Sequence, residues 1–478
     1  MTRLSALGSA ALIAIVLVVF SASPARSAQT RAFVYATDFS SGSLANIQFG
    51  PPRTVSTNVA TVSPDAVLRH FDGLLYVVNR LGFDNIKVLD PSQSFAIVQE
   101  FSVDNGSNPH DIEFVSSSKA YVSRYESPDL WIVNPQTGQH TGTISLAAFA
   151  DADGIPEMDH LALRNGKLFV SIQRLDRNNF FAPTDSSQIV VIDPATDAVV
   201  DVDPGAGGNQ GIILPFQNPT TELVVDPSGE LLVGCVGNFG VLDGGIVRVD
   251  PIALDVAAIE ITESALGGDV NDVAPFTGQR GFAVISDASF ATILKAYRRD
   301  LGTVQSILYS TAGFFLADIE VNDRDELWVC DRTFTDPGVR IFDAVTGTQL
   351  TAMPLNVGLP PQDIAFDGTI PVTAVPLPSG DFGMVPAIAS IAPNPFRSHT
   401  TVHFTLPDAV LGEDVRCTVV DLAGRLLSST VLRATAPGVH SVSWDGNDAH
   451  GRPAPHGVYF VSVGTSRGRA SARILRLP

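Results

Sequence analysis

Residues 109–135, PHDIEFVSSSKAYVSRYESPDLWIVNP, contain the pattern that decides the fold. Asp111 begins a short apolar run, a second run is centred on Tyr121, and a third ends at Asn134 and Pro135. Short apolar runs that alternate with turn residues indicate β-strands. The same layout returns three more times along the chain. The acids that stand ten residues before an apolar centre are Asp111, Glu222, Asp272 and Asp318.

The repeat has a period near 45 residues. Its centres are Tyr76, Tyr121, Phe169, Leu232, Phe282 and Trp328, at separations of 45, 48, 63, 50 and 46 residues. Four short strands in about 45 residues are typical of a β-propeller blade. Six units are complete, and segments 31–47 and 361–366 would pair as a seventh that leaves no open sheet edge. We therefore predict an all-β fold with a seven-bladed β-propeller over residues 29–371, six or eight blades being the alternatives.

The two ends of the chain differ from the repeats. Arg3 precedes an apolar run, residues 11–20, and small residues follow, a pattern typical of a secretory signal peptide. We predict a signal peptide over residues 1–28 and no later membrane span, with an uncleaved anchor as the alternative. Residues 372–388 are rich in turn residues and are predicted to be a linker, so that residues 389–478 form a second domain.

Composition excludes one class of partner. The chain has 30 Lys+Arg against 50 Asp+Glu, a net charge of −20 and a pI near 4.7. Nucleic-acid surfaces need basic residues that neutralise phosphates, so we expect no nucleic-acid binding. The three cysteines show no metal-binding or CxxC spacing, which predicts buried thiols.

Two sets of motifs resemble known families. The strands VVNR, VSRY and VISD, with the corners VLDP, IVNP and VIDP, resemble the YVTN and surface-layer type propellers of secreted bacterial proteins. In residues 389–478, the motifs PNPF, DLAGR, WDGNDAHG and GVYF resemble, in this order, the FlgD-like Ig-like module also called a type IX secretion type A sorting domain. That resemblance implies a C-terminal Ig-like β-sandwich that directs export across the outer membrane or attachment to the cell surface. Use of the module as a plain spacer is the alternative.

A glycine turn in residues 151–160 gathers four carboxylates. Calcium takes six to eight oxygen ligands, and a D-x-D-G turn directs alternate carboxylates toward one point. The pattern therefore allows two interpretations, a solvated acidic loop, which we favour, and a calcium site. The candidate ligands are Asp151, Asp153, Glu157 and Asp159.

A second set of acids occupies the start of the first strand in successive repeats. The inner strands of a propeller line its axis, so these side chains would form a ring that attracts cations and raises some carboxylate pKa values. Alternatively, each acid caps its own turn or binds backbone N–H groups of the next blade. The ring comprises Asp111, Asp159, Glu222, Asp272, Asp318 and Asp363.

The interval of 63 residues between Phe169 and Leu232 breaks the repeat, and it contains insertions at residues 175–185 and 203–211. Extra loops on a repeat scaffold tend to carry function. Phe180 and Phe181 could stack on a sugar or a partner, or could pack on their own blade. The remaining candidate binding residues are Arg174 and Arg177 beside the first insertion, and His110 and His160 beside ring acids.

Two classes of function fit this sequence. The first is a non-catalytic exported protein, secreted or on the outer cell surface, whose propeller binds a protein or polysaccharide and whose C-terminal domain engages the sorting machinery. The second is a secreted, metal-dependent hydrolase of the lactonase-like kind, with His110 or His160 as a base at the channel mouth. No Gly-x-Ser-x-Gly nucleophile elbow is present, so we predict no catalytic residues and favour the first class.

Overall fold

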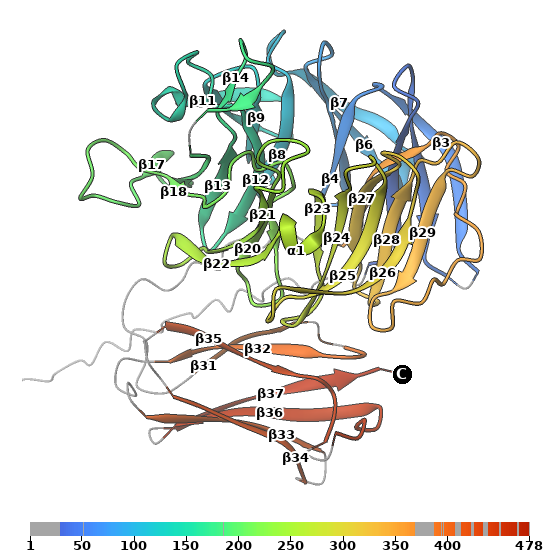
Figure 1. The fold of residues 1–478 in the computed structure, drawn as a ribbon. Helices are drawn as coiled ribbons and strands as arrows, with labels where there is room; N and C mark the ends of the chain where they lie inside the picture. The colour runs from blue at the N-terminus through green and yellow to red at the C-terminus, as the bar shows by residue number, and fades with distance from the viewer. Residues whose placement is uncertain are drawn as a thin grey trace, which may run out of the picture.

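The computed structural model describes most of the chain and is built almost entirely of β-strands (Figure 1). The described residues are 29–50, 52–184, 186–368, 387–392, 394, 396–406, 413–421, 425–433, 438–448, 451–465 and 468–477. Among them the short segments are α1 (Glu263–Leu266), η1 (Pro91–Gln93) and η2 (Ala147–Phe149). The predicted signal peptide and most of the predicted linker lie outside the described residues. No helix in the described part is long and apolar enough to cross a bilayer.

Residues 31–366 form seven antiparallel sheets of three to five strands, which is a propeller-like arrangement. The first three are β30 (Pro361–Phe366), β1 (Arg31–Thr37), β2 (Gly42–Gln48) and β3 (Thr54–Val62); β4 (Ala66–Phe71), β5 (Leu74–Asn79), β6 (Asn85–Asp90) and β7 (Ala96–Ser102); and β8 (Pro109–Ser116), β9 (Lys119–Arg124), β10 (Asp129–Asn134) and β11 (Gln139–Ser145). The fourth is β12 (Met158–Arg164), β13 (Lys167–Ile172), β16 (Gln188–Asp193) and β17 (Ala198–Val200), with β18 (Ile212–Ile213) paired to β16.

The remaining sheets follow the same order. They are β19 (Val224–Val225), β20 (Leu231–Cys235), β21 (Gly245–Asp250) and β22 (Asp255–Thr262); β23 (Asp269–Pro275), β24 (Arg280–Ser286), β25 (Thr292–Arg298) and β26 (Thr303–Ser310); and β27 (Leu316–Val321), β28 (Glu326–Asp331) and β29 (Gly338–Asp343). A small extra hairpin, β14 (Leu175–Asp176) and β15 (Ala182–Pro183), lies in the insertion between β13 and β16. We call β30, β4, β8, β12, β19, β23 and β27 the inner strands, because β30, β4, β8 and β12, and likewise β19, β23, β27 and β30, contact one another in series.

The first and last segments of this region share one sheet. β1 pairs with β30, with Val34 opposite Ile364, as the sequence predicted for segments 31–47 and 361–366. Hydrophobic clusters fill the space between successive sheets, and one joins Trp328 of β28 to Phe49 and Phe366 of the first sheet. Burial of apolar side chains between sheets is therefore the main source of packing free energy in this region.

Strand register places one set of loops at one end of the sheets. The first residue of an inner strand pairs with the last residue of the second strand, as Leu316 does with Asp331. The loop after each second strand therefore lies at the end where the inner strands begin. We call this end the loop face; its loops are 38–41, 80–84, 125–128, 173–184, 236–244, 287–291 and 332–337.

The C-terminal strands form a two-sheet sandwich. One sheet contains β31 (Ala387–Ala392), β32 (Thr400–Leu406) and β35 (Gly438–Trp444), and the other β34 (Leu426–Arg433), β33 (Asp414–Asp421), β36 (Gly457–Thr465) and β37 (Gly468–Arg476). Phe404, Trp444 and Val461 are buried between them.

The sandwich contacts turns at the end opposite the loop face. Ser398 Oγ donates to Asp325 Oδ2 (2.6 Å), and the His399 ring lies edge-on to Phe276 at 5.7 Å. Asp325 and Phe276 both belong to turns between an inner strand and the second strand. In Figure 1 the sandwich accordingly lies at the bottom and the β14 hairpin at the top.

The packing between sheets leads to a stability prediction. Trp328 is fully buried, whereas Phe334, in the loop after the same strand, is 90% exposed. Trp328→Ala should lower the free energy of unfolding by about 3–5 kcal/mol, because it removes a large core side chain. Phe334→Ala should leave it nearly unchanged in the same denaturant titration, and equal losses for both variants would contradict the described packing.

Candidate functional site

Acidic side chains of the inner strands bind the backbone of the neighbouring sheet. In four cases a carboxylate accepts a hydrogen bond from an N–H group of the next inner strand. The pairs are Leu68 with Asp363 (2.6 Å), Leu161 with Asp111 (2.9 Å), Ile319 with Asp272 (2.7 Å) and Ile364 with Asp318 (2.7 Å). This is the second arrangement that we inferred for the ring acids, in which they tie one sheet to the next.

Strand register shows which residues are equivalent. In β8, Asp111 lies two residues before Glu113, which pairs with the apolar centre Tyr121 of the second strand. The same rule in β12, where Ala162 pairs with Phe169, gives His160 as the equivalent residue. The sequence analysis placed Asp159 in the ring, but the β12 hairpin is one residue shorter, so the neighbouring His160 occupies the equivalent position. The ring positions are therefore Asp363, Val67, Asp111, His160, Glu222, Asp272 and Asp318.

Asp159 instead orients a histidine. Its Oδ1 lies 2.7 Å from His110 Nδ1, and its Oδ2 accepts a hydrogen bond from Gln173 Nε2 at 2.7 Å. Tyr125 stacks on the His110 ring at 4.2 Å and donates its hydroxyl to Gln173 Oε1 at 2.7 Å. These four side chains form a closed network at the loop-face end of the inner strands, which fixes the His110 ring.

Arg69 supplies positive charge that the sequence analysis missed. Its Nε lies 2.8 Å from Asp111 Oδ1, and its Nη1 lies 2.9 Å from Glu222 Oε1. It stands two residues after Val67, the one apolar residue among the ring positions. The absence of an acid at this position of the repeat was the sequence signal that could have drawn attention to Arg69.

His160 lies between two carboxylates. Its Nδ1 is 3.8 Å from Asp111 Oδ2 and its Nε2 is 3.6 Å from Asp159 Oδ1. Burial alone would lower the pKa of His160, but Asp159 and Asp111 outweigh burial and raise that pKa to about 9. Both predicted histidines therefore meet at Asp159, with His160 protonated at neutral pH.

The ring positions of β23, β27 and β30, away from the two histidines, are all acidic. Burial, together with the negative charge of Glu222, raises the pKa values of Asp272 and Asp363 to about 7. Burial and the nearby carboxylates raise the pKa of Asp318 well above its usual range. The predicted like-charge repulsion thus contributes, and burial is the larger cause. Two further acids on the same faces of β8 and β27, which the repeat count did not single out, are Glu113 and Glu320.

The candidate calcium ligands each contact other groups of the chain. Glu157 is buried, and it accepts hydrogen bonds from the Leu175 N–H and from Arg177 Nε, both at 2.9 Å. Arg177 also lies 3.5 Å from Asp153, and Asp151 accepts a hydrogen bond from Thr184 (2.9 Å). The described part of the chain contains no group of three or more His, Cys, Asp or Glu residues placed to hold a metal ion. Calcium binding at these residues therefore stays the alternative hypothesis, which the metal test below addresses.

The insertion after β13 exposes its aromatic residues. Phe180 is 97% exposed and Phe181 is 48% exposed. The flanking Arg174 Nη1 donates to Ser186 O (3.2 Å), and Arg177 reaches Glu126 as well as Glu157. Arginine contacts therefore fix both sides of a loop whose tip presents a phenylalanine to solvent.

The same feature recurs around the loop face, which the sequence analysis did not recognise. Six of the seven sheets expose a phenylalanine in the loop after the second strand, and the remaining loop contains Tyr125. We call the six residues the aromatic rim. They are Phe39 (69% exposed), Phe83 (50%), Phe180 (97%), Phe239 (73%), Phe290 (64%) and Phe334 (90%).

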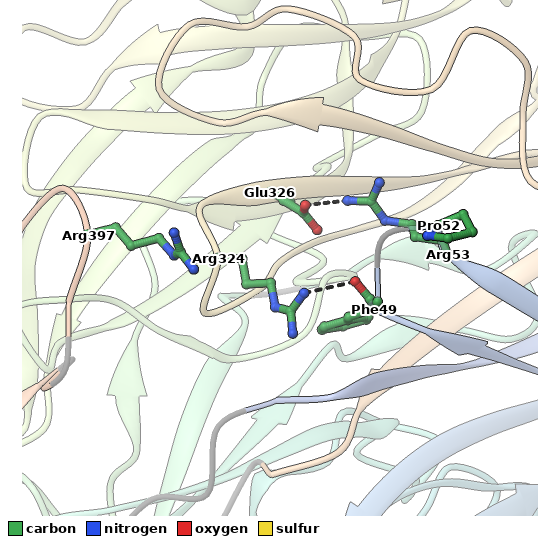
Figure 2. A pocket seen from close by; sticks show the side chains of 7 residues that line it. Phe49, Pro52, Arg53, Arg324, Glu326 and Arg397 are labelled. Carbon is green, nitrogen blue, oxygen red and sulfur yellow. Dashed lines mark hydrogen bonds and ion pairs between the residues drawn. The ribbon is translucent and has the colours of Figure 1, made fainter. Parts of the chain in front are cut away.

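A separate pocket of about 530 Å³ lies beside the sandwich (Figure 2). Arg324 Nη1 donates to Phe49 O at 2.9 Å, Arg53 pairs with Glu326, and Arg397 of the C-terminal domain completes the lining. Arg53 and Arg324 thus connect the first and last sheets beside the C-terminal domain.

Comparisons with known proteins identify the C-terminal domain. Residues 397–469 match the FlgD Ig-like domain. No curated protein matches the chain. Similar solved structures include PorZ of the type IX secretion system of Porphyromonas gingivalis (14% identity, TM-score 0.39, 91% of this chain and 63% of that chain). Others are a putative 6-phosphogluconolactonase from Bacteroides fragilis (12%, 0.47, 71% and 98%) and streptogramin B lyase (10%, 0.42, 63% and 91%).

These structural matches are distant. The chain spans less than two thirds of the PorZ chain that it matches. All three TM-scores are below 0.5 and all three identities are below 25%, so the matches carry no argument about function.

The electrostatics of the mouth lead to a pH prediction. Folding raises the pKa values of Asp272 and Asp363 to about 7 and that of His160 to about 9, so each group binds its proton more tightly in the folded state. The stability that these protons contribute is present at low pH and is lost as the pH rises through the folded values. We expect the Tm to fall as the pH is raised from about 5 to about 9.

The variant Asp272→Asn/Asp363→Asn should flatten this fall between about pH 5 and pH 7, because asparagine keeps an acceptor oxygen and does not titrate. His160→Gln should flatten it only above about pH 7. A Tm that rises over the whole range would contradict the described burial of these carboxylates.

The carboxylates at residues 151–157 allow a metal test. Arg177 already supplies a positive charge between Glu157 and Asp153, so we expect EDTA to leave the Tm of the full chain unchanged. The measurement is thermal unfolding with EDTA or with calcium, combined with elemental analysis. Stoichiometric calcium whose removal lowers the Tm by several degrees would establish the metal site instead.

Proposed function

We propose that the chain is an exported surface protein whose propeller binds a partner through the loop face, while the FlgD-like Ig-like domain serves sorting or attachment. The aromatic rim is the observation that carries this proposal. Large apolar side chains that gather on one side of a soluble domain mark interaction sites, because their exposure to water is unfavourable. Single exposed phenylalanines are common, but exposed phenylalanines at the same end of six of the seven sheets are a pattern.

We further propose that the seven sheets are the blades of a closed, seven-bladed propeller. Pairing of β1 with β30 supports closure, because it joins the two ends of the region by backbone hydrogen bonds. The cluster around Trp328 supports it as well, since it packs the last sheet on the first. Closure therefore places the first and last segments of the region in one sheet, and the unpaired edges that remain are those of the outer strands.

The position of the C-terminal domain supports the choice of face. Ser398 and His399 contact turns at the opposite end of the sheets, so the loop face points away from the domain that would sort or attach the protein. A partner can therefore reach the rim while the C-terminal domain is engaged.

One observation favours the alternative, a secreted metal-dependent hydrolase. His110 is held by Asp159 and Tyr125 at the channel mouth, and a histidine oriented by a carboxylate can act as a general base. Around it, Asp111, Asp272, Asp318 and Asp363 accept hydrogen bonds from backbone N–H groups, and Glu222 pairs with Arg69. The alternative needs a metal, so elemental analysis that finds no copurified metal would count against it.

Site-specific photo-crosslinking tests the binding platform. A photo-reactive phenylalanine analogue would replace Phe180 or Phe334 in the full chain, expressed in its own cells. We expect light-dependent adducts with a partner from both positions, because both side chains are almost fully exposed on the loop face. Ile307, which is 60% exposed on the outer strand β26, is the matched control and should give none. Adducts from Ile307 alone would contradict the proposal.

A further inference from the structure

Aromatic contacts join the rim of two neighbouring sheets, those of β24 and β28. The rings of Phe290 and Phe314 lie 5.4 Å apart, and those of Phe315 and Phe334 lie 5.1 Å apart. Phe314 is itself 59% exposed. These pairs connect the sheets of β24 and β28, so a ligand would meet an apolar arc there.

Rings on this face already accept guanidinium groups from the chain itself. Arg332 lies over the ring of Phe39 at 4.6 Å, and Arg177 lies over the ring of Phe181 at 5.7 Å. Both distances are within the range of cation–π attraction, which Arg and Lys make with aromatic faces. Phe39 and Phe181 nevertheless remain 69% and 48% exposed.

Charge on the loop face is predominantly negative. The exposed carboxylates in its loops and connectors include Asp38 and Asp243, and also Asp104, which pairs with Arg124 (3.0 Å). The arginines there are held by the chain: Arg80 pairs with Asp65 (2.6 Å), Arg177 pairs with Glu157 (2.9 Å), and Arg332 donates to Thr37 O (3.1 Å). An approaching ligand therefore meets apolar rings among carboxylates, and complementary charge on the ligand is positive.

We propose that the partner of the loop face is a basic polypeptide segment, in which lysine or arginine residues alternate with apolar or aromatic anchors. This inference rests on the proposed binding platform and specifies its partner. The anchors pack on the arc of Phe290, Phe314 and Phe334, and the basic side chains meet the carboxylates and the open ring faces. Acidic polysaccharides are disfavoured, because the same carboxylates repel them.

A selection experiment tests the partner class. The full chain would be immobilised and screened with a phage library of random dodecapeptides, and enriched peptides would be measured by fluorescence polarisation. We expect enriched peptides to combine a positive net charge with aromatic or aliphatic residues. The triple variant Phe290→Ser/Phe314→Ser/Phe334→Ser should weaken their binding about tenfold or more, since a few central aromatic anchors dominate interface free energy.

A second triple variant provides the matched control. Ile97→Ser/Ile259→Ser/Ile307→Ser removes side chains that are 57%, 48% and 60% exposed on the outer strands β7, β22 and β26. It should bind the peptides like the unchanged chain, and the Tm of each variant reports whether it is folded. Raising the salt from about 0.1 M to about 0.5 M should weaken binding, because the charges lie at the surface.

The outcomes separate the two proposals. Neutral or acidic peptides whose binding depends on Phe290, Phe314 and Phe334 would overturn the basic partner and leave the platform standing. Glycan-array binding that depends on these residues, without peptide enrichment, would do the same. Enriched peptides that bind both triple variants and the unchanged chain equally would show that the aromatic rim does not bind them. The proposed binding platform would then lose its main support.

Discussion

Hydrogen bonds from inner-strand carboxylates to the next sheet are the constraint on which this structure depends. Inner strands of neighbouring sheets lie side by side, and some of their N–H groups need an acceptor from outside their own sheet. Asp318 and Asp363 supply one to the following strand. Asp111 and Asp272 are the ring residues that come after Val67 and Glu222, and each accepts a hydrogen bond from the N–H of the following residue in its own strand. Joining the sheets thus concentrates buried negative charge along one axis, which raises carboxylate pKa values.

The repeat pattern was sufficient to predict the propeller-like fold and the acids of the inner strands. Their distance from an apolar centre is fixed by hairpin length, which the sequence records directly. The sequence analysis named Asp159 as the ring residue of β12 in place of its neighbour His160, because the β12 hairpin is shorter by one residue. It also passed over Arg69, whose partner Glu222 belongs to a sheet far away in the sequence. Contacts across an axis depend on closure of the whole ring, so no local pattern reports them.

The aromatic rim was missed for a different physical reason. Its residues lie two to eight positions after the end of the second strand, in loops of unequal length, so no period connects them. Phe180 attracted attention because its insertion is long, whereas Phe334 lies in a short loop that resembles any turn. Only exposure and position at one end of the sheets relate the two residues. Side-chain chemistry could be read from the sequence, but its arrangement on a surface required the fold.

The two ends of the sheets carry different chemistry, and strand direction accounts for the division. Turns between inner and second strands are short and hold the contacts with the C-terminal domain, such as Ser398 with Asp325. Each loop after a second strand connects that strand to the third strand of the same sheet. Its length can therefore vary without displacing the inner strand. Phenylalanines placed in these loops change the chemistry of the loop face and leave the hydrogen bonds of the inner-strand carboxylates intact. The fold therefore allows the loop face to vary while the contacts with the C-terminal domain stay the same.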